Sequence, residues 1–119
     1  MADSISVSLP RDGTAAMRAV RESRGFAMTV TDREILNAIP TVAQGANVFA
    51  EPAGAAAYAG LAKCAAAGSV REDDSAVVVI TGSGLKDVDN ALKVAGRPHD
   101  VGATMASVRR TLARMKGEA

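Results

Sequence analysis

The composition of this 119-residue chain excludes several kinds of protein. Its formal net charge of +1 gives no overall field that would attract nucleic acid or an anionic membrane, and no run of about 18 apolar residues indicates a membrane-spanning helix. Cys64 is the only cysteine, so no internal disulfide can form, and we expect a cytoplasmic protein without a secretory signal. The length suits a single domain over residues 1–119.

The N-terminal segment predicts a strand followed by a helix. Apolar residues alternate with serines over residues 5–9, and this period of two predicts a strand with one buried face. Pro10 would end that strand. Asp12 is in a position to cap a helix over residues 13–23, and residues 27–30 could form a second short strand.

A capping box predicts the start of the next helix. In the sequence Thr31-Asp32-Arg33-Glu34, the Thr31 hydroxyl can accept from the Glu34 amide while the Glu34 carboxylate reaches back. Pro40 lies inside this helix, where it removes a backbone hydrogen bond, so we expect a kink or an early end near Ile39.

The middle of the chain predicts a buried helix and a buried strand. A proline begins the helix predicted over residues 52–67, and Gly68 suits its C-terminal cap. The absent side chains of Gly54 and Gly60 would let another backbone approach this helix. Residues 76–80 form a continuous β-branched run, which is typical of a parallel strand buried on both faces.

The C-terminal third predicts a short helix over residues 87–94 and a longer one over residues 101–115. The longer helix carries one apolar stripe that self-association would cover, made of Val101, Met105, Val108, Leu112 and Met115. Strands and helices thus alternate along the chain. This order predicts an α/β fold, a partial three-layer sheet of mainly parallel strands with flanking helices.

One loop carries the residues best suited to bind a ligand. Thr81, Gly82, Ser83 and Gly84 follow the strand predicted over residues 76–80, and open α/β sheets bind ligands beyond the carboxyl ends of their strands. The glycines permit close approach, and the threonine hydroxyl can donate and accept hydrogen bonds. The simpler alternative is a strand that ends in a glycine turn, because the loop lacks the full motifs of nucleotide-binding loops.

Other candidate residues have simpler interpretations beside the functional ones. Glu51 precedes a helix, where its carboxylate could be partly desolvated or could cap the helix. His99 is the only histidine, so a histidine-rich metal site is excluded and we expect no metal. Cys64 lies on an apolar helix face and is better interpreted as a buried thiol than as a nucleophile.

Three stretches in order resemble a known enzyme family. They are residues 2–23, residues 30–61 with the text EPAGAAA, and residues 77–87 with the text VVVITGSGLKD. Together they resemble the C-terminal portion of threonine synthase, a fold-type-II pyridoxal-phosphate enzyme, over residues 2–95. Residues 96–119 would then be an additional amphipathic helix.

The resemblance implies a cofactor site. Such enzymes convert O-phosphohomoserine and water to threonine and phosphate, with pyridoxal phosphate as the electron sink. By this resemblance, Thr81 matches the hydroxyl residue that hydrogen-bonds the pyridine nitrogen of the cofactor. Gly82, Ser83 and Gly84 would form the loop beside the ring, and Glu51 matches the glutamate of the EPA motif on the cofactor side.

The resemblance also implies that the site is incomplete. The Schiff-base lysine and the glycine-rich phosphate loop of the family lie upstream of the matching region, and the lysines present here lie in other contexts. Pyridoxal phosphate would therefore bind only if a partner chain completed the site, and the chain would not catalyse the reaction alone. Two interpretations stay open: a lyase segment that works with a complementary N-terminal fragment, and a stand-alone, non-enzymatic module that binds a ligand or forms homo-oligomers. Neither involves nucleic acid or a membrane.

Overall fold

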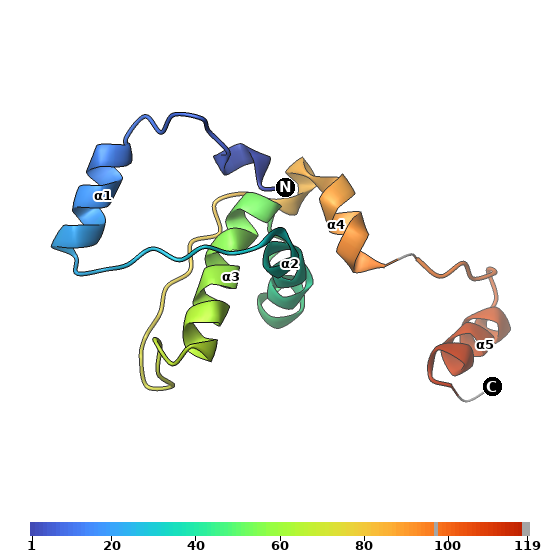
Figure 1. The fold of residues 1–119 in the computed structure, drawn as a ribbon. Coiled ribbons are helices and arrows are strands. Elements are labelled where there is room, and N and C mark those ends of the chain that lie inside the picture. Colours follow the sequence, from blue (N-terminus) through green and yellow to red (C-terminus); the bar gives the residue numbers. More distant parts are fainter. Residues whose placement is uncertain (97, 118–119) are drawn as a thin grey trace.

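The computed structural model describes residues 1–96 and 98–117, and these form a helical protein. The elements in order are the 3₁₀ turn η1 (Asp3–Ile5), the helices α1 (Gly13–Glu22), α2 (Asp32–Ala46) and α3 (Pro52–Ala66), the 3₁₀ turn η2 (Gly84–Lys86), and the helices α4 (Val88–Ala95) and α5 (Met105–Met115). Helices α2 and α3 pack together at the centre and α4 contacts α2, whereas α1 and α5 lie at opposite ends of the molecule (Figure 1). None of the described helices combines the length and the apolar character needed to cross a membrane.

Local signals correctly predict most helix ends. The capping box forms as predicted, because Glu34 N donates to Thr31 Oγ1 at 3.2 Å and Thr31 N donates to Glu34 Oε2 at 2.6 Å. Helix α3 ends one residue before the predicted position, and Gly68 follows it with a φ of +72°, which a glycine adopts without strain. Helix α5 begins later than predicted, where the Thr104 side chain accepts from Ser107 N.

The early end predicted at Pro40 is wrong. Helix α2 continues to Ala46, and Asn47 ends it with a left-handed φ of 55°. Buried residues on both sides of the proline hold the helix against α3, so tertiary packing outweighs the one lost backbone hydrogen bond. Thr41 Oγ1 also donates to the Asn37 carbonyl at 2.9 Å, one turn back along the helix.

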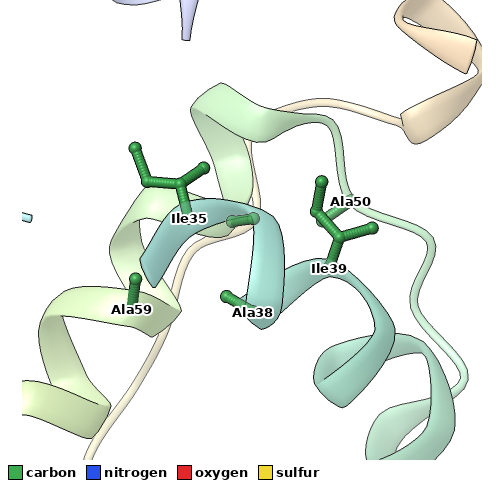
Figure 2. Close-up of a cluster of buried hydrophobic side chains, with 6 residues drawn as sticks. Ile35, Ala38, Ile39, Ala50 and Ala59 are labelled. Atoms are coloured by element: carbon green, nitrogen blue, oxygen red, sulfur yellow. The ribbon is translucent and has the colours of Figure 1, made fainter. Parts of the chain in front are cut away.

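The core is small and lies between α2 and α3. Its alanines leave little side chain between the two helices, so the backbones approach closely. The buried cluster consists of Ile35, Ala38, Ile39, Ala50, Ala55 and Ala59 (Figure 2). At the edge of this core, Lys63 Nζ lies 3.1 Å from Glu34 Oε1 and ties α3 to the first turn of α2.

The predicted α/β fold is wrong for the part of the chain that the structure describes. Residues 5–9, 27–30 and 76–80 form no strands, and the one β-bridge among the described residues is an isolated antiparallel pair, Ala50 and Ser83. Residues 76–80 have no regular secondary structure, and Val77 is 91% exposed although a buried strand would cover it. A segment becomes a β-strand only when a neighbouring segment pairs with its backbone N–H and C=O groups. No other described segment pairs with residues 76–80 in this way.

The molecule is more open than a compact domain of its length. Its radius of gyration is 18.9 Å, whereas a compact domain of 119 residues has about 13.5 Å. Its accessible surface is 9327 Å², whereas a folded monomer of 12.1 kDa exposes about 6,000 Å². The difference, about 3,300 Å², includes the apolar stripe of α5, whose Met105, Leu112 and Met115 are exposed.

Candidate functional site

The structure brings Glu51 and the predicted loop together, although they lie far apart in the sequence. Glu51 N donates to the Gly82 carbonyl at 3.0 Å, and Gly84 N donates to the Phe49 carbonyl at 2.9 Å. These hydrogen bonds flank the bridge between Ala50 and Ser83. The loop is therefore fixed to the segment that enters α3.

Two glycines of the loop make room for side chains of the same chain. A Cβ atom at Gly82 would overlap the Glu51 carboxylate, and a Cβ atom at Gly84 would overlap the ring of Phe49. Neither glycine has a positive φ, so close approach rather than an unusual backbone conformation explains them. Contacts within the chain therefore give both glycines a structural role.

A third glycine lets the helix approach the loop. A Cβ atom at Gly54, in the first turn of α3, would lie 3.1 Å from Ile80 Cγ2 and 3.3 Å from Thr81 N. The prediction that Gly54 lets another backbone approach is confirmed. The same prediction for Gly60 is wrong, because nothing lies within 4 Å of its Cβ position.

Glu51 is a buried carboxylate with polar neighbours. It is 4% exposed, which favours the first of its two interpretations, a desolvated carboxylate. Ser4 Oγ donates to Glu51 Oε2 at 3.4 Å, and Lys86 Nζ lies 4.0 Å from Glu51 Oε1. These three residues line a cavity of about 270 Å³. Glu51 precedes α3 as its cap residue, but its carboxylate forms no capping hydrogen bond, so capping does not explain the carboxylate.

Thr81 is exposed at the point where residues 76–80 reach the loop. Its amide lies close to α3 at Gly54, while the residue as a whole is exposed. Ser83 is also exposed, and its hydroxyl accepts from Leu85 N at 3.3 Å at the start of η2. Of the predicted loop, the Thr81 hydroxyl is thus best placed to meet a ligand from outside the chain.

Sequence reasoning missed two neighbours of the site. Lys86 Nζ lies 4.0 Å from Glu51 Oε1, and the neighbouring Asp87 caps α4 by accepting from Asn90 N. Hydrogen bonds from Asn90, first from its side chain, lower the pKa of Asp87. Ser4 contacts the site from the N-terminal turn. No pattern in the sequence signals that contact, because it depends on the tertiary fold.

The remaining candidates lie away from this site. Cys64 is buried, as predicted, and His99 is exposed. Lys63 donates to the Thr29 carbonyl at 3.0 Å and to Glu34 Oε2 at 3.3 Å. Among the residues with described positions, no three histidine, cysteine, aspartate or glutamate side chains gather in a way that could hold a metal ion.

Comparison with known proteins identifies the family. Residues 1–82 match the family described as "Pyridoxal-phosphate dependent enzyme". The chain belongs to this family. It is 44% identical over 93 residues to threonine synthase of Mycobacterium leprae and 44% identical over 92 residues to that of Halalkalibacterium halodurans. It is 35% identical over 112 residues to threonine synthase of Methanocaldococcus jannaschii.

The chain spans about a quarter of the length of the curated relatives it matches. The matches cover 78%, 77% and 94% of this chain, but only 26%, 26% and 28% of the three relatives. At most 26 of the 119 residues lie outside the Mycobacterium match, which therefore includes residues 27–93 and the whole candidate site. The Methanocaldococcus match extends into α5, so that helix has a counterpart in this relative.

The residues present fit the cofactor of this family at one point. Thr81 is an exposed residue, and a threonine hydroxyl can donate a hydrogen bond to an aromatic nitrogen. The space at Gly82 and Gly84 is filled by Glu51 and Phe49, so these glycines serve contacts within the chain. A cofactor-binding role for Glu51 and for residues 81–84 stays a prediction.

Proposed function

We propose that this chain forms one wall of a pyridoxal-phosphate site in a threonine-synthase-type enzyme, and that a complementary polypeptide forms the other wall. The observation that carries the proposal is the exposed residue Thr81, on a loop that is hydrogen-bonded to the segment entering α3. The similarity to threonine synthases supports O-phosphohomoserine as the substrate and threonine and phosphate as the products.

In this proposal the chain binds and orients the cofactor. The Thr81 hydroxyl donates to the pyridine nitrogen, and because a hydroxyl is neutral, that nitrogen stays unprotonated. Bound pyridoxal phosphate supplies the electron sink for the reaction. The backbone of residues 82–84 forms the edge of the site beside Thr81, and the complementary polypeptide contributes the lysine and the phosphate-binding loop.

The open shape of the chain supports a permanent partner. Permanent complexes bury about 2,000–5,000 Å² in total. The excess exposed surface of this chain, about 3,300 Å², is large enough to supply its side of such an interface. A partner that covers it would also exclude water from the cofactor.

The first test reconstitutes the enzyme. The chain is mixed with the complementary N-terminal polypeptide of a threonine synthase and with pyridoxal phosphate, and cofactor absorbance and phosphate release from O-phosphohomoserine are measured. Thr81→Val, which removes the hydroxyl at nearly constant shape, should lower phosphate release about tenfold while assembly is kept, because one hydrogen bond to the cofactor is lost.

Thr29→Val, at an exposed threonine outside the site, is the matched control and should leave phosphate release unchanged. If the two polypeptides form a complex that takes up no cofactor, or if Thr81→Val is as active as the unchanged chain, the proposal fails.

A second candidate function is a non-enzymatic module that forms homo-oligomers. The exposed apolar stripe of α5 favours it, because monomeric proteins rarely leave such a face uncovered. The reconstitution test separates the two candidates, because only the first takes up pyridoxal phosphate together with the complementary polypeptide.

A further inference from the structure

Glu51 packs against Gly82, and a position beside a cofactor does not explain this contact. Among the described residues, it is the one charged side chain in the buried class. Its carboxylate occupies the space that a side chain at Gly82 would need. Burying a charge is costly unless the position has a structural or functional use, so this placement needs a reason.

Two side chains lock the loop on either side of one bridge. Phe49 fills the space at Gly84, and Glu51 fills the space at Gly82, while Ala50 between them pairs with Ser83. Side chains of residues two apart on an extended segment point to the same side, which is why both can face the loop. The loop therefore cannot shift along its partner without a clash or a void.

Further contacts of Glu51 extend this lock. Ser4 Oγ, on η1, lies 3.4 Å from Glu51 Oε2, and Lys86 Nζ, at the end of η2, lies 4.0 Å from Glu51 Oε1. The carboxylate thus connects the N-terminal turn, the start of α3 and the turn that follows the loop.

We infer that Glu51 is a positioning residue for Thr81: by filling the space at Gly82, it holds the loop in the conformation that presents the Thr81 hydroxyl. It acts through the loop and does not need to touch the cofactor. The role of Thr81 rests on the proposed function, but the contact between Glu51 and Gly82 does not.

A double-mutant cycle on the chain alone tests the contact. Gly82→Ala should lower the unfolding midpoint by about 5 °C, because the new methyl group must displace the buried carboxylate. In a chain that carries Glu51→Ala, the space is empty, and Gly82→Ala should cost less than about 1 °C or raise the midpoint. Gly60→Ala, on the open side of α3, is the control and should not lower the midpoint. Equal effects of Gly82→Ala in both backgrounds would overturn the inference.

Amide hydrogen exchange reports on the loop itself. Glu51 N and Gly84 N donate the hydrogen bonds that hold the loop, so their exchange should accelerate at least tenfold in Gly82→Ala and return toward the original rate in the double variant. Glu51→Gln keeps the shape of the side chain and should leave both rates within threefold. Unchanged exchange in Gly82→Ala would contradict a positioning role.

The reconstituted complex separates positioning from direct contact. If Glu51 acts through the loop, Glu51→Gln should keep the absorbance maximum of bound pyridoxal phosphate. A shifted maximum with unchanged exchange rates would show direct contact with the cofactor and would overturn the inference. If no cofactor binds at all, the proposed function fails, while the midpoints and exchange rates still decide whether Glu51 holds the loop.

Discussion

The Glu34 carboxylate serves two elements at once. It accepts from the backbone and hydroxyl of Thr31, which completes the capping box of α2, and it pairs with Lys63 on α3. These contacts favour the ionised form. The hydrogen bond from the Thr31 backbone, followed by those from its hydroxyl and from Lys63, lowers the pKa of Glu34 below its usual value of 4.5.

The stability of the chain should therefore fall when Glu34 is protonated. A carboxylate whose pKa is lowered by folding stabilises the protein above its unfolded pKa of 4.5, and this contribution is lost as the pH falls through the lower folded pKa. Glu34→Gln keeps a capping side chain without the charge, so its deficit relative to the unchanged chain should shrink between pH 6 and pH 3. Urea unfolding across this range measures the deficit.

Glu22→Gln removes one charge from a carboxylate that is 73% exposed, and it serves as the control. A deficit for Glu34→Gln that stays constant down to pH 3 would show that the charge of Glu34 does not stabilise the folded chain.

Contacts between near neighbours were predictable, and contacts across the chain were not. The capping box joins residues three apart, so the sequence alone reveals it. The fit of Glu51 at Gly82 joins residues that only the tertiary fold brings together. The sequence identified both residues as candidates for the site, but it could not show that one fills the space left by the other.

At the level of helices, α2 tolerates a proline where propensity predicts an end. Pro40 removes one hydrogen bond in the interior of α2, yet the helix continues to Ala46 because its apolar face is buried against α3. The proline therefore lowers stability without changing the fold of this element.

Replacing this proline should stabilise the protein. Pro40→Ala restores an amide that can donate along the helix, and we expect the free energy of unfolding to rise by about 1–3 kcal/mol. Chemical denaturation measures the change. Pro52→Ala, at the first position of α3, is the control and should bring no gain, because proline is well suited to that position. If Pro40→Ala lowers the free energy of unfolding, the proline ring makes packing contacts that stabilise the protein more than the restored hydrogen bond does.

The missing sheet shows the limit of pattern analysis for extended segments. The β-branched run over residues 76–80 favours a strand by propensity, but the chain forms no regular secondary structure there. Whether such a segment becomes a strand depends on neighbours, which no local pattern encodes. Helices satisfy their own backbone groups, which is why all five helix predictions from residues 13 to 115 correspond to observed helices, with α5 shorter than predicted, while the strand predictions fail.

At the level of the whole molecule, the exposed surface predicts association. The stripe of α5 is apolar and exposed, and α5 lies apart from the small core between α2 and α3 (Figure 1). Burying such a stripe against another polypeptide is favourable because it removes apolar area from water.

We expect the chain alone to self-associate as its concentration rises. Leu112→Glu should shift the average molecular mass toward the 12.1 kDa of a single chain, because a charge within the stripe opposes its burial. Light scattering at several concentrations measures the mass. Arg110→Gln changes the net charge by the same amount outside the stripe and should not shift the mass. A mass of one chain at every concentration would exclude the homo-oligomer and leave the complementary polypeptide as the partner.

The lock between Glu51 and Gly82 also bears on the thermodynamics of assembly. A loop held by its own chain has already lost its conformational freedom before a second polypeptide arrives, so docking there costs little further entropy. Helices α1 and α5 lie away from the core and have few contacts with the other elements, so a partner that packs against them would have to fix their positions at a cost in entropy. Shortening the chain at either end could therefore speed the capture of a partner even where it weakens the final complex.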